Sequence, residues 1–380
     1  MIRQLSNQTR DYAWGSTTLI PDYFGTPETG RPMAEIWFGT HPGSLTKVVG
    51  EDQQTLLALR ENQPLDFLLK ILAAGNPLSL QAHPNAEQAQ EGFARESSLG
   101  IALDATNRNY KDDRHKPEML VALTPFDALA GFRPIAESEA LFQKLASQTN
   151  PVLGSHFNDW LIALRGGLEE FFVLISQLRG QIDQVTLALA QLEPSMFGND
   201  AVHIELAKEL QILYPGDPGI VVSLLMNHIH LEPEQAIQIG AGQVHAYVRG
   251  LGVEIMASSD NVLRGGLTPK HIDVDELQRV VVFEGVQPKV LSAKQLATGL
   301  FEYPRAVRDY LLYRINVSAT NLLADIKLPS AAIVLCTSGQ VAVSNSLGER
   351  EVLSKGQAAY LDHANFVSFS GSGTAYLATS

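Results

Sequence analysis

Short apolar runs, each interrupted by Gly, Pro, Asn or Asp, make up most of the first third of the chain, as far as Pro134. Runs of this length between turn-forming residues are typical of β-strands joined by loops. One helix is expected at residues 85–94, because Ala, Glu and Gln recur there at helical spacing directly after Pro84. The pattern therefore predicts a mainly β region that contains some helix.

The hydrophobic period changes between residues 135 and 213, where Leu, Phe and Ile recur three and four residues apart. This spacing, with polar residues between the apolar ones, predicts amphipathic helices. The segment ends at residues 214–219, where two prolines and two glycines make helix continuation very costly. A domain boundary is predicted at this turn.

The strand pattern returns after this turn and continues to the end of the chain. We therefore predict a helical domain, residues 135–217, inserted in a discontinuous β domain made of residues 1–134 and 218–303. Residues 304–380 carry short strand candidates between Ser-Gly and Lys-Gly turns and are predicted to form a third, all-β unit. The candidate strands after the turn are residues 220–225, 236–239, 279–283, 332–335, 340–343 and 366–369.

The composition is that of an ordinary globular protein, since 45% of the 380 residues are hydrophobic and 18% are charged. The chain has 28 Lys and Arg against 41 Asp and Glu, a net charge of −13, with no block of Lys and Arg. Such an acidic chain repels a nucleic-acid backbone. An anionic ligand would need a few positive groups gathered in one place.

Cys336 is the only cysteine, so neither an intrachain disulfide nor a thiolate-rich metal site can form. No apolar run approaches the ~20 residues that cross a bilayer, and the first residues lack the apolar core of a signal peptide. We therefore expect a cytoplasmic, monomeric protein that binds neither nucleic acid nor a membrane.

Two polar patterns stand out among the predicted strands of the first region. Strand-like alternation places Ser79, Gln81 and His83 on one face. Lys116 and Glu118 lie two positions apart at the start of an apolar run, so an extended chain puts them on one face too. A buried carboxylate needs a cation, which Lys116 or a metal would supply. The ordinary alternatives are a solvated strand face and a surface ion pair.

A third pattern is the glycine-containing turn before His245, which directs the imidazole toward a barrel mouth with Tyr247 on the same strand face. A half-exposed histidine is the ordinary alternative. Without thiolates, zinc must be held by imidazole and oxygen donors. One anionic ligand leaves the ion a net charge of about +1, which favours Lewis-acid catalysis over scaffolding. One set that meets these requirements is Gln81, His83, Glu118 and His245.

Further candidates lie in a strand and its polar, glycine-containing loop. Glu254, Asp260 and Arg264 are expected to line one pocket, and Arg264 is suited to binding two oxygens of a phosphate or an enediolate. An ordinary strand and loop is the alternative. Lys70 stands alone inside an apolar run, so its ammonium either reaches the surface or binds a ligand. Residues 228–230, His-Ile-His, have metal-ligand spacing but no associated carboxylate, and we prefer the first set.

Five separated motifs, in the same order, resemble those of the type I phosphomannose isomerases, a zinc-dependent family built on cupin (jelly-roll) β-barrels. The resemblance covers most of the chain and implies a mainly β fold with cupin barrels and an inserted helical domain. The acids at positions 112 and 113, near Arg114, depart from the family pattern. The motifs are YAWGS at 12–16, AEIWFGTHP at 34–42, LQAHPN at 80–85, HKPEM at 115–119 and SSDNVLRGGLTPK at 258–270.

The resemblance implies one zinc ion per chain and a sugar-phosphate substrate. The implied reaction interconverts mannose 6-phosphate and fructose 6-phosphate through a cis-enediol, with Lys116 or Glu254 as the base. The implied zinc ligands are Gln81, His83, Glu118 and His245; the catalytic candidates are Arg264, Lys116, Glu254, His115 and Asp260; the substrate contacts are Tyr247, Lys70, Lys270, Ser79 and Trp14.

Two other function classes use a similar shell of ligands. A non-catalytic cupin could bind a sugar phosphate as a sensor, but Lys116, Glu254 and Arg264 beside the metal favour an enzyme. A cupin-type iron oxygenase would prefer two histidines and a carboxylate around a redox metal, and Gln81 argues against it.

Overall fold

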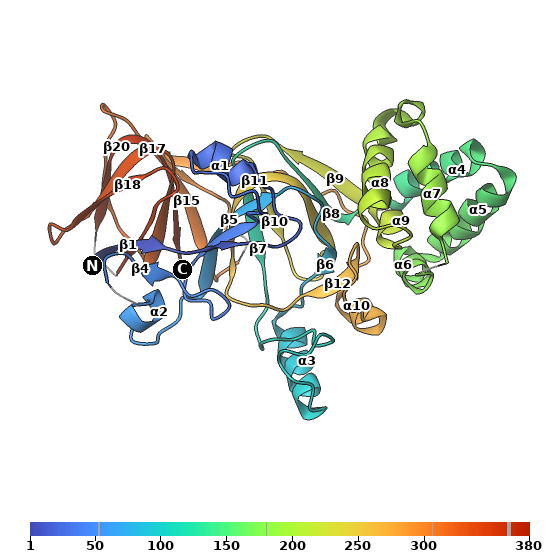
Figure 1. Ribbon diagram of the computed structural model, residues 1–380, viewed down its shortest axis with the longest axis horizontal. Helices are drawn as coiled ribbons and strands as arrows, with labels where there is room; N and C mark the ends of the chain where they lie inside the picture. The colour runs from blue at the N-terminus through green and yellow to red at the C-terminus, as the bar shows by residue number, and fades with distance from the viewer. Residues whose placement is uncertain (52–53, 180, 306, 363–365) are drawn as a thin grey trace.

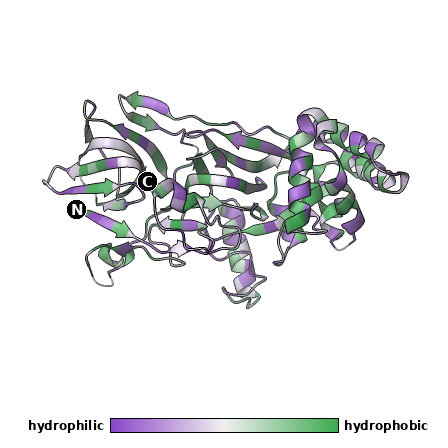
Figure 2. Cartoon of the chain, turned by 45° about the horizontal axis from the view of Figure 1, so that its top comes forward, coloured by the Kyte–Doolittle hydropathy of each residue, from purple (hydrophilic) through white to green (hydrophobic). Residues whose placement is uncertain are grey.

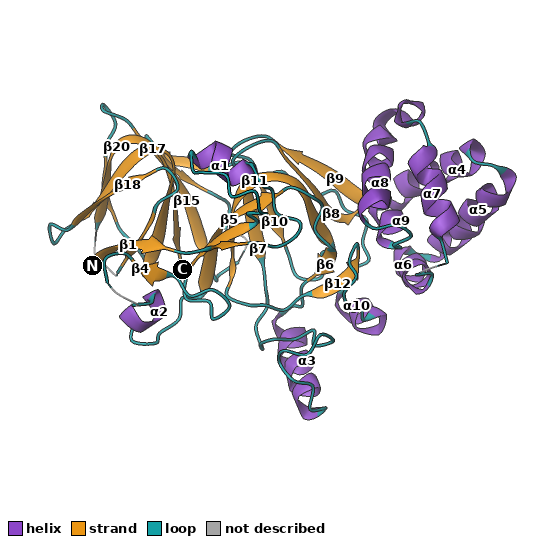
Figure 3. Ribbon diagram, viewed as in Figure 1, coloured by secondary structure: helices purple, strands orange, loops and turns teal. Residues whose placement is uncertain are grey.

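The computed structural model describes residues 1–51, 54–179, 181–305, 307–362 and 366–380. Two β-sheets occupy one end and the centre of an elongated molecule, and most of the helices gather at the other end (Figure 1, Figure 3). The mainly β architecture confirms the fold class expected from the sequence at that level. The cupin jelly-roll and the domain limits at 134, 217 and 303 stay predictions.

The central sheet carries the candidate site residues and is antiparallel throughout. Its longest strand, β11 (His245–Ala257), changes partners at Gly250. This glycine has a φ of 126° and lies against the backbone of Phe126. Before this glycine β11 pairs with β6 (Leu80–Ala82) and β8 (Phe126–Phe132). After it, β11 pairs with β5 (Phe67–Ala74) and β7 (Glu118–Ala122). Its strands are β2 (Thr9–Arg10), β3 (Glu35–Phe38), β5 (Phe67–Ala74), β6 (Leu80–Ala82), β7 (Glu118–Ala122), β8 (Phe126–Phe132), β9 (Met226–Leu231), β10 (Ala236–Ile239), β11 (His245–Ala257) and β12 (Leu263–Gly266).

The second sheet unites the two ends of the chain, which lie on the same side of the molecule (Figure 1). The predicted strands at 332–335 and 340–343 form one continuous strand, because a bulge between Cys336 and Ser338 replaces the expected turn. Its strands are β1 (Ile2–Ser6), β4 (Lys47–Val48), β13 (Lys294–Ala297), β14 (Leu300–Glu302), β15 (Leu311–Val317), β16 (Leu323–Ile326), β17 (Ala332–Asn345), β18 (Arg350–Ser354), β19 (Ala358–Leu361) and β20 (Val367–Thr379).

The amphipathic segment forms consecutive helices, as predicted, and its apolar face shares one core with the central sheet. Phe142, Phe172 and Leu210 belong to this core together with Leu80 and Leu263 of the sheet. Figure 2 shows the mixed hydrophobic and hydrophilic faces of these helices. The helices are α4 (Ile135–Gln148), α5 (Pro151–Gly166), α6 (Leu168–Gln177), α7 (Asp183–Gln191), the 3-10 helix η1 (Pro194–Asp200) and α8 (Ala201–Leu213).

Shorter helices lie between the strands. The helix predicted after Pro84 is confirmed, and Asn85 and Gln88 cap it reciprocally. None of the described helices is long and apolar enough to cross a membrane. The remaining helices are α1 (Leu19–Phe24), α2 (Leu56–Leu59), α3 (Ala86–Ser98), α9 (Gly219–Ser223) and α10 (Val274–Val280).

Two strand predictions were wrong. Residues 220–225 lie mostly in α9, where Ile220, Val221 and Val222 are completely or almost completely buried. Residues 279–283 begin in the last turn of α10, whose start is fixed by the Asp273 carboxylate accepting a hydrogen bond from the Glu276 amide. The run at 220–225 is buried on all sides and has no polar face, so its pattern does not distinguish helix from strand.

Candidate functional site

Three predicted ligands converge at the centre of the first sheet. His83 follows β6, Glu118 opens β7 and His245 opens β11, and all three are at most 2% exposed. One potential ligand atom from each lies within 4.8 Å of the others. Within the described ranges of the chain, this is the one such group of His, Cys, Asp and Glu side chains.

The tautomers of the two imidazoles leave ligand atoms free. His83 Nδ1 lies 2.8 Å from the Asn261 carbonyl and His245 Nδ1 lies 3.0 Å from the Gln243 carbonyl, so each Nδ1–H donates to the backbone. Each Nε2 therefore carries a lone pair. These atoms face Glu118 Oε1 at 3.3 Å and Oε2 at 3.4 Å, respectively.

This arrangement fits a bound cation. Neither Nε2 has a hydrogen-bond partner among the residues described. Lone pairs facing a carboxylate repel it unless a proton or a metal lies between them, and burial lowers the pKa of His83 to about 4, which disfavours the proton. Two imidazoles and a carboxylate are donors that zinc accepts. Each Nδ1–H bond to a carbonyl also fixes the ring, as in known metal sites.

Gln81 connects this cluster to a cavity of about 590 Å³. It lies opposite His245 on one side and opposite Arg264 of β12 on the other. Opposed residues on antiparallel strands project from the same face, so the three side chains form a row. The predicted site residues on the cavity wall are Trp14, Ser79, Gln81, Arg264 and Lys270.

Arg264 and Lys270 give this cavity a positive wall. Within the described ranges, neither side chain forms an ion pair with a carboxylate. Burial lowers the pKa of both groups, and the charge of Arg264 lowers that of Lys270 further. Two cations without a counter-ion suit a ligand that carries an oxyanion.

A buried network of opposite charges lies in the sheet interior beside the cluster. Lys70 Nζ is 2.9 Å from Glu254 Oε2 and 3.5 Å from Glu35 Oε1, and Glu35 Oε2 accepts a hydrogen bond from Trp37 Nε1 at 2.8 Å. Of the two alternatives left open for Lys70, the surface position does not hold, since the residue is only 6% exposed. Burial alone would lower its pKa, but the charges of Glu254 and Glu35 outweigh this and raise it.

Lys116 and Glu118 share a face, as their spacing predicts, with Lys116 Nζ 3.0 Å from Glu118 Oε1. Burial opposes the charge on Glu118, but Lys116 and the two neighbouring histidines together outweigh burial and hold the pKa of the carboxyl well below its usual value. Burial raises the pKa of Glu254 despite the nearby Lys70. The two acidic groups are therefore shifted in opposite directions.

The shared pocket of Glu254, Asp260 and Arg264 stays a prediction, since the three residues have different surroundings. Only Arg264 lines the cavity, whereas Glu254 binds Lys70 and Asp260 Oδ2 lies 3.3 Å from His41 Nε2. His115 Nε2 lies 2.8 Å from Asp309 Oδ1.

Tyr247 and the histidines of the His-Ile-His segment also lie off the cavity wall. Tyr247 is 1% exposed, and its hydroxyl lacks a hydrogen-bond partner in the described part of the chain. Burial, followed by the charge of Glu254, raises its pKa well above 10.0. His230 pairs with Asp127 at 2.7 Å, and His228 lies beside His203 with ring centroids 6.3 Å apart.

Sequence reasoning missed the supporting residue Asn261. Its carbonyl orients His83, its Oδ1 accepts from the Lys111 amide at 2.7 Å, and its Nδ2 donates to the Arg114 carbonyl at 2.7 Å. Asp112 joins the same loops, because its carboxylate accepts from the Ser259 hydroxyl and the Asp260 amide, both at 2.8 Å. The presence of this Asn in the motif at 258–270 was a signal that it matters. Its partners could not be predicted, because they lie about 150 positions away in the chain.

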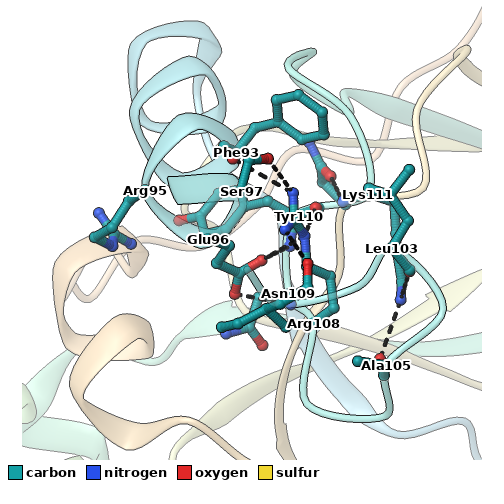
Figure 4. Close-up of polar contacts among 12 residues, drawn as sticks. Phe93, Arg95, Glu96, Ser97, Leu103, Ala105, Arg108, Asn109, Tyr110 and Lys111 are labelled. Atoms are coloured by element: carbon teal, nitrogen blue, oxygen red, sulfur yellow. Dashed lines mark hydrogen bonds and ion pairs between the residues drawn. The ribbon is translucent and has the colours of Figure 1, made fainter. Parts of the chain in front are cut away.

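The loop that ends at Lys111 is held from its other side by α3 (Figure 4). Arg108 Nε lies 3.0 Å from Glu96 Oε2, and both residues are buried. Glu96 also accepts from the amides of Asn109 and Tyr110 at 3.1 and 2.9 Å. This buried pair anchors the chain immediately before the residues that bind Asn261.

Comparison with known proteins gives one consistent result. Residues 2–135 match the catalytic domain of type I phosphomannose isomerase. The chain is 36% identical over 356 residues, 89% of each chain, to mannose-6-phosphate isomerase of Escherichia coli (strain K12). It is 32% identical over 384 residues to that of Homo sapiens, covering 90% of this chain and 88% of the human protein.

A solved structure shares the whole fold. The mannose 6-phosphate isomerase from Salmonella typhimurium, bound to fructose 6-phosphate and zinc, superimposes with a TM-score of 0.84 at 32% identity. The match covers 100% of this chain and 99% of that chain.

Proposed function

The chain belongs to the type I phosphomannose isomerases, and from this premise we propose that it interconverts mannose 6-phosphate and fructose 6-phosphate through a cis-enediol intermediate. It is a zinc-dependent isomerase. The proposal rests on the convergence of His83, Glu118 and His245 next to a cavity with two cations on its wall, neither of which pairs with a carboxylate of the described residues.

The zinc would be held by Gln81, His83, Glu118 and His245. Three of these offer converging ligand atoms, and Gln81 lies opposite His245 in the strand pairing. When bound, the ion supplies a Lewis acid that stabilises negative charge on substrate oxygens.

Glu254 is the better candidate for the proton-transfer base. The isomerisation removes a proton from C2 and returns it to C1, so one group must accept and then donate the same proton. Burial raises the pKa of Glu254, which makes this carboxylate a stronger proton acceptor than an exposed one. Lys116 is already engaged in an ion pair, because its Nζ lies 3.0 Å from the carboxylate of Glu118, one of the proposed zinc ligands.

Arg264 and Lys270 are proposed to bind the phosphate, with Trp14 and Ser79 contacting the sugar. All four line the cavity, and the two cations offer donors to several phosphate oxygens at once. They give an acidic protein the local positive site that an anionic substrate requires.

The test is a coupled assay that detects fructose 6-phosphate formed from mannose 6-phosphate. We expect turnover by the zinc-loaded protein, loss of turnover after chelation and recovery when zinc is restored. Binding of mannose 6-phosphate without turnover would instead support the non-catalytic sensor, and an absence of both would refute the proposal.

A further inference from the structure

We propose that Asp217, in the turn that follows α8, is a positioning residue for the loop at 267–270 that forms part of the substrate cavity. The turn is the same Pro- and Gly-rich segment that marks the end of the helical region in the sequence. The inference deepens the proposed function, because this loop carries Lys270 toward the phosphate.

The Asp217 carboxylate accepts backbone hydrogen bonds from both turns. It is 6% exposed, and its Oδ1 accepts from the amides of Gly219 at 2.8 Å and Leu267 at 2.9 Å. Oδ2 accepts from the Thr268 amide at 3.4 Å and lies 3.6 Å from the Arg179 guanidinium. Successive backbone amides directed at one point form an anion-binding site. Here the bound anion is the Asp217 carboxylate of the protein itself.

The backbone at Leu267 needs this support. Its φ of 53° lies in the left-handed region, which a non-glycine residue occupies only when its surroundings enforce it. The amide of Leu267 is one of the two that Asp217 binds through Oδ1. Removing the carboxylate would therefore leave a strained turn without the acceptor that holds it.

The two turns also touch backbone to backbone. A Cβ at Gly219 would lie 2.8 Å from the Leu267 amide nitrogen, and a Cβ at Gly266 would lie 2.8 Å from the Gly219 Cα. Only glycine permits this approach, which brings the Asp217 carboxylate within reach of the loop.

The helical region contacts the cavity at further points. Leu213 and Tyr214 line it, and the Tyr214 hydroxyl donates to the Pro77 carbonyl at 2.9 Å. Arg179 donates to the Thr268 carbonyl. The helices therefore help to shape the wall that carries Arg264 and Lys270, and Asp217 is the buried charge at that contact.

The decisive variant is Asp217→Asn, which keeps the side-chain size but replaces the charged acceptor of three amides by a single carbonyl oxygen. We expect KM for mannose 6-phosphate to rise about tenfold with kcat within about twofold, the signature of lost binding in ground and transition states alike. Zinc content should be unchanged. The inhibition constant of inorganic phosphate should rise by a similar factor.

Asp200→Asn is the matched control. Asp200 belongs to the same helical region and accepts from Arg133 at 2.6 Å, but it does not line the cavity. The Asp200→Asn variant should have a lower melting temperature but an unchanged KM and an unchanged inhibition constant for phosphate. A purely structural role for Asp217 would give both variants that same behaviour and would overturn the proposal.

Gly219→Ala provides an independent test if Asp217→Asn does not fold. The added methyl displaces the Leu267 backbone, so KM should rise again with kcat maintained. Unchanged KM in a folded Gly219→Ala protein counts against the proposal. An inactive wild-type protein would refute the proposed isomerase, whereas the effect of Asp217 would still be measured by direct calorimetric binding of inorganic phosphate.

Discussion

Gln81 and His245 lie directly opposite each other on the antiparallel strands β6 and β11, and Arg264 faces Gln81 from the other side. These three residues form a row in which the Gln81 amide lies between the buried cluster of His83, Glu118 and His245 and the positive wall of the cavity. A ligand that spans this row would meet the metal at one end and the cations at the other. The strand register therefore sets the distance between the two binding functions.

Purified protein is expected to contain one zinc per chain, and His83→Ala should lose zinc and turnover together. His83 offers a free Nε2 lone pair in a fully buried site, which no nearby group can replace. His228→Ala is the matched control, because His228 lies near His203 and outside the cluster. Elemental analysis and the coupled assay measure both effects. Loss of zinc in the His228 variant alone would invalidate the ligand set.

Arg264→Lys should reduce kcat/KM by on the order of 10²-fold or more while zinc content stays unchanged. Lysine keeps the positive charge but lacks the planar fork that binds two oxygens at once. Steady-state kinetics with elemental analysis checks this. Near-normal turnover would transfer the phosphate role to Lys270, the other cation on the cavity wall.

Glu254→Gln should lower kcat by roughly 10²- to 10⁴-fold, because the amide cannot accept the C2 proton. Zinc content and substrate affinity should be retained, since Glu118 and the cavity cations are intact. Glu35→Gln is the control: it also removes a carboxylate near Lys70 but leaves Glu254 in place. If the Glu35 change proves as damaging as the Glu254 change, the charge balance of Lys70, not proton transfer, accounts for the loss.

The ion pair between His115 and Asp309 should contribute to stability in a limited pH window. The hydrogen bond to Asp309 raises the pKa of His115 above 6.5, and the same bond lowers the pKa of Asp309 below 3.8. The contribution is complete between these two unfolded-state values. It is lost as pH rises through the higher folded pKa of His115 and as pH falls through the lower folded pKa of Asp309.

His115→Ala should therefore lower the melting temperature more at pH 5.5 than at pH 9. The loss of unfolding free energy caused by the substitution should be larger at pH 5.5 by roughly 0.2–1 kcal/mol, the range for ion pairs whose side chains are partly exposed. Thermal unfolding of wild type and variant at the two pH values measures it. An equal decrease in melting temperature at both pH values would mean that packing, not the ion pair, accounts for the effect of the substitution.

Several parts of the site were readable from the sequence because they depend on local geometry. Alternation along a strand placed Lys116 and Glu118 on one face, and the structure confirms their contact at 3.0 Å. The helix after Pro84 was predictable for the same reason, since Ala, Glu and Gln recur there at helical spacing. The family resemblance then named Gln81, His83, Glu118 and His245 as a set, and the structure brings the last three together.

Other features depended on which distant segments meet. Residues 220–225 read as a strand because burial on all sides removes the polar face that distinguishes a helix. Lys70 was ambiguous because its partners Glu35 and Glu254 lie 35 and 184 positions away. Asn261 was not recognised because its function is to bind the backbone of another loop.

The sequence by itself determined the types of groups, their spacing along each strand and the segments that end in turns, since these follow from bonded geometry over a few residues. Only the tertiary structure decided that Arg264 faces Gln81, that Lys70 is buried between two carboxylates and that Asp217 binds the turn at Leu267. Such contacts depend on strand register and on the packing of segments far apart in the chain. Their energies arise from burial and pairing that exist only after the segments have met.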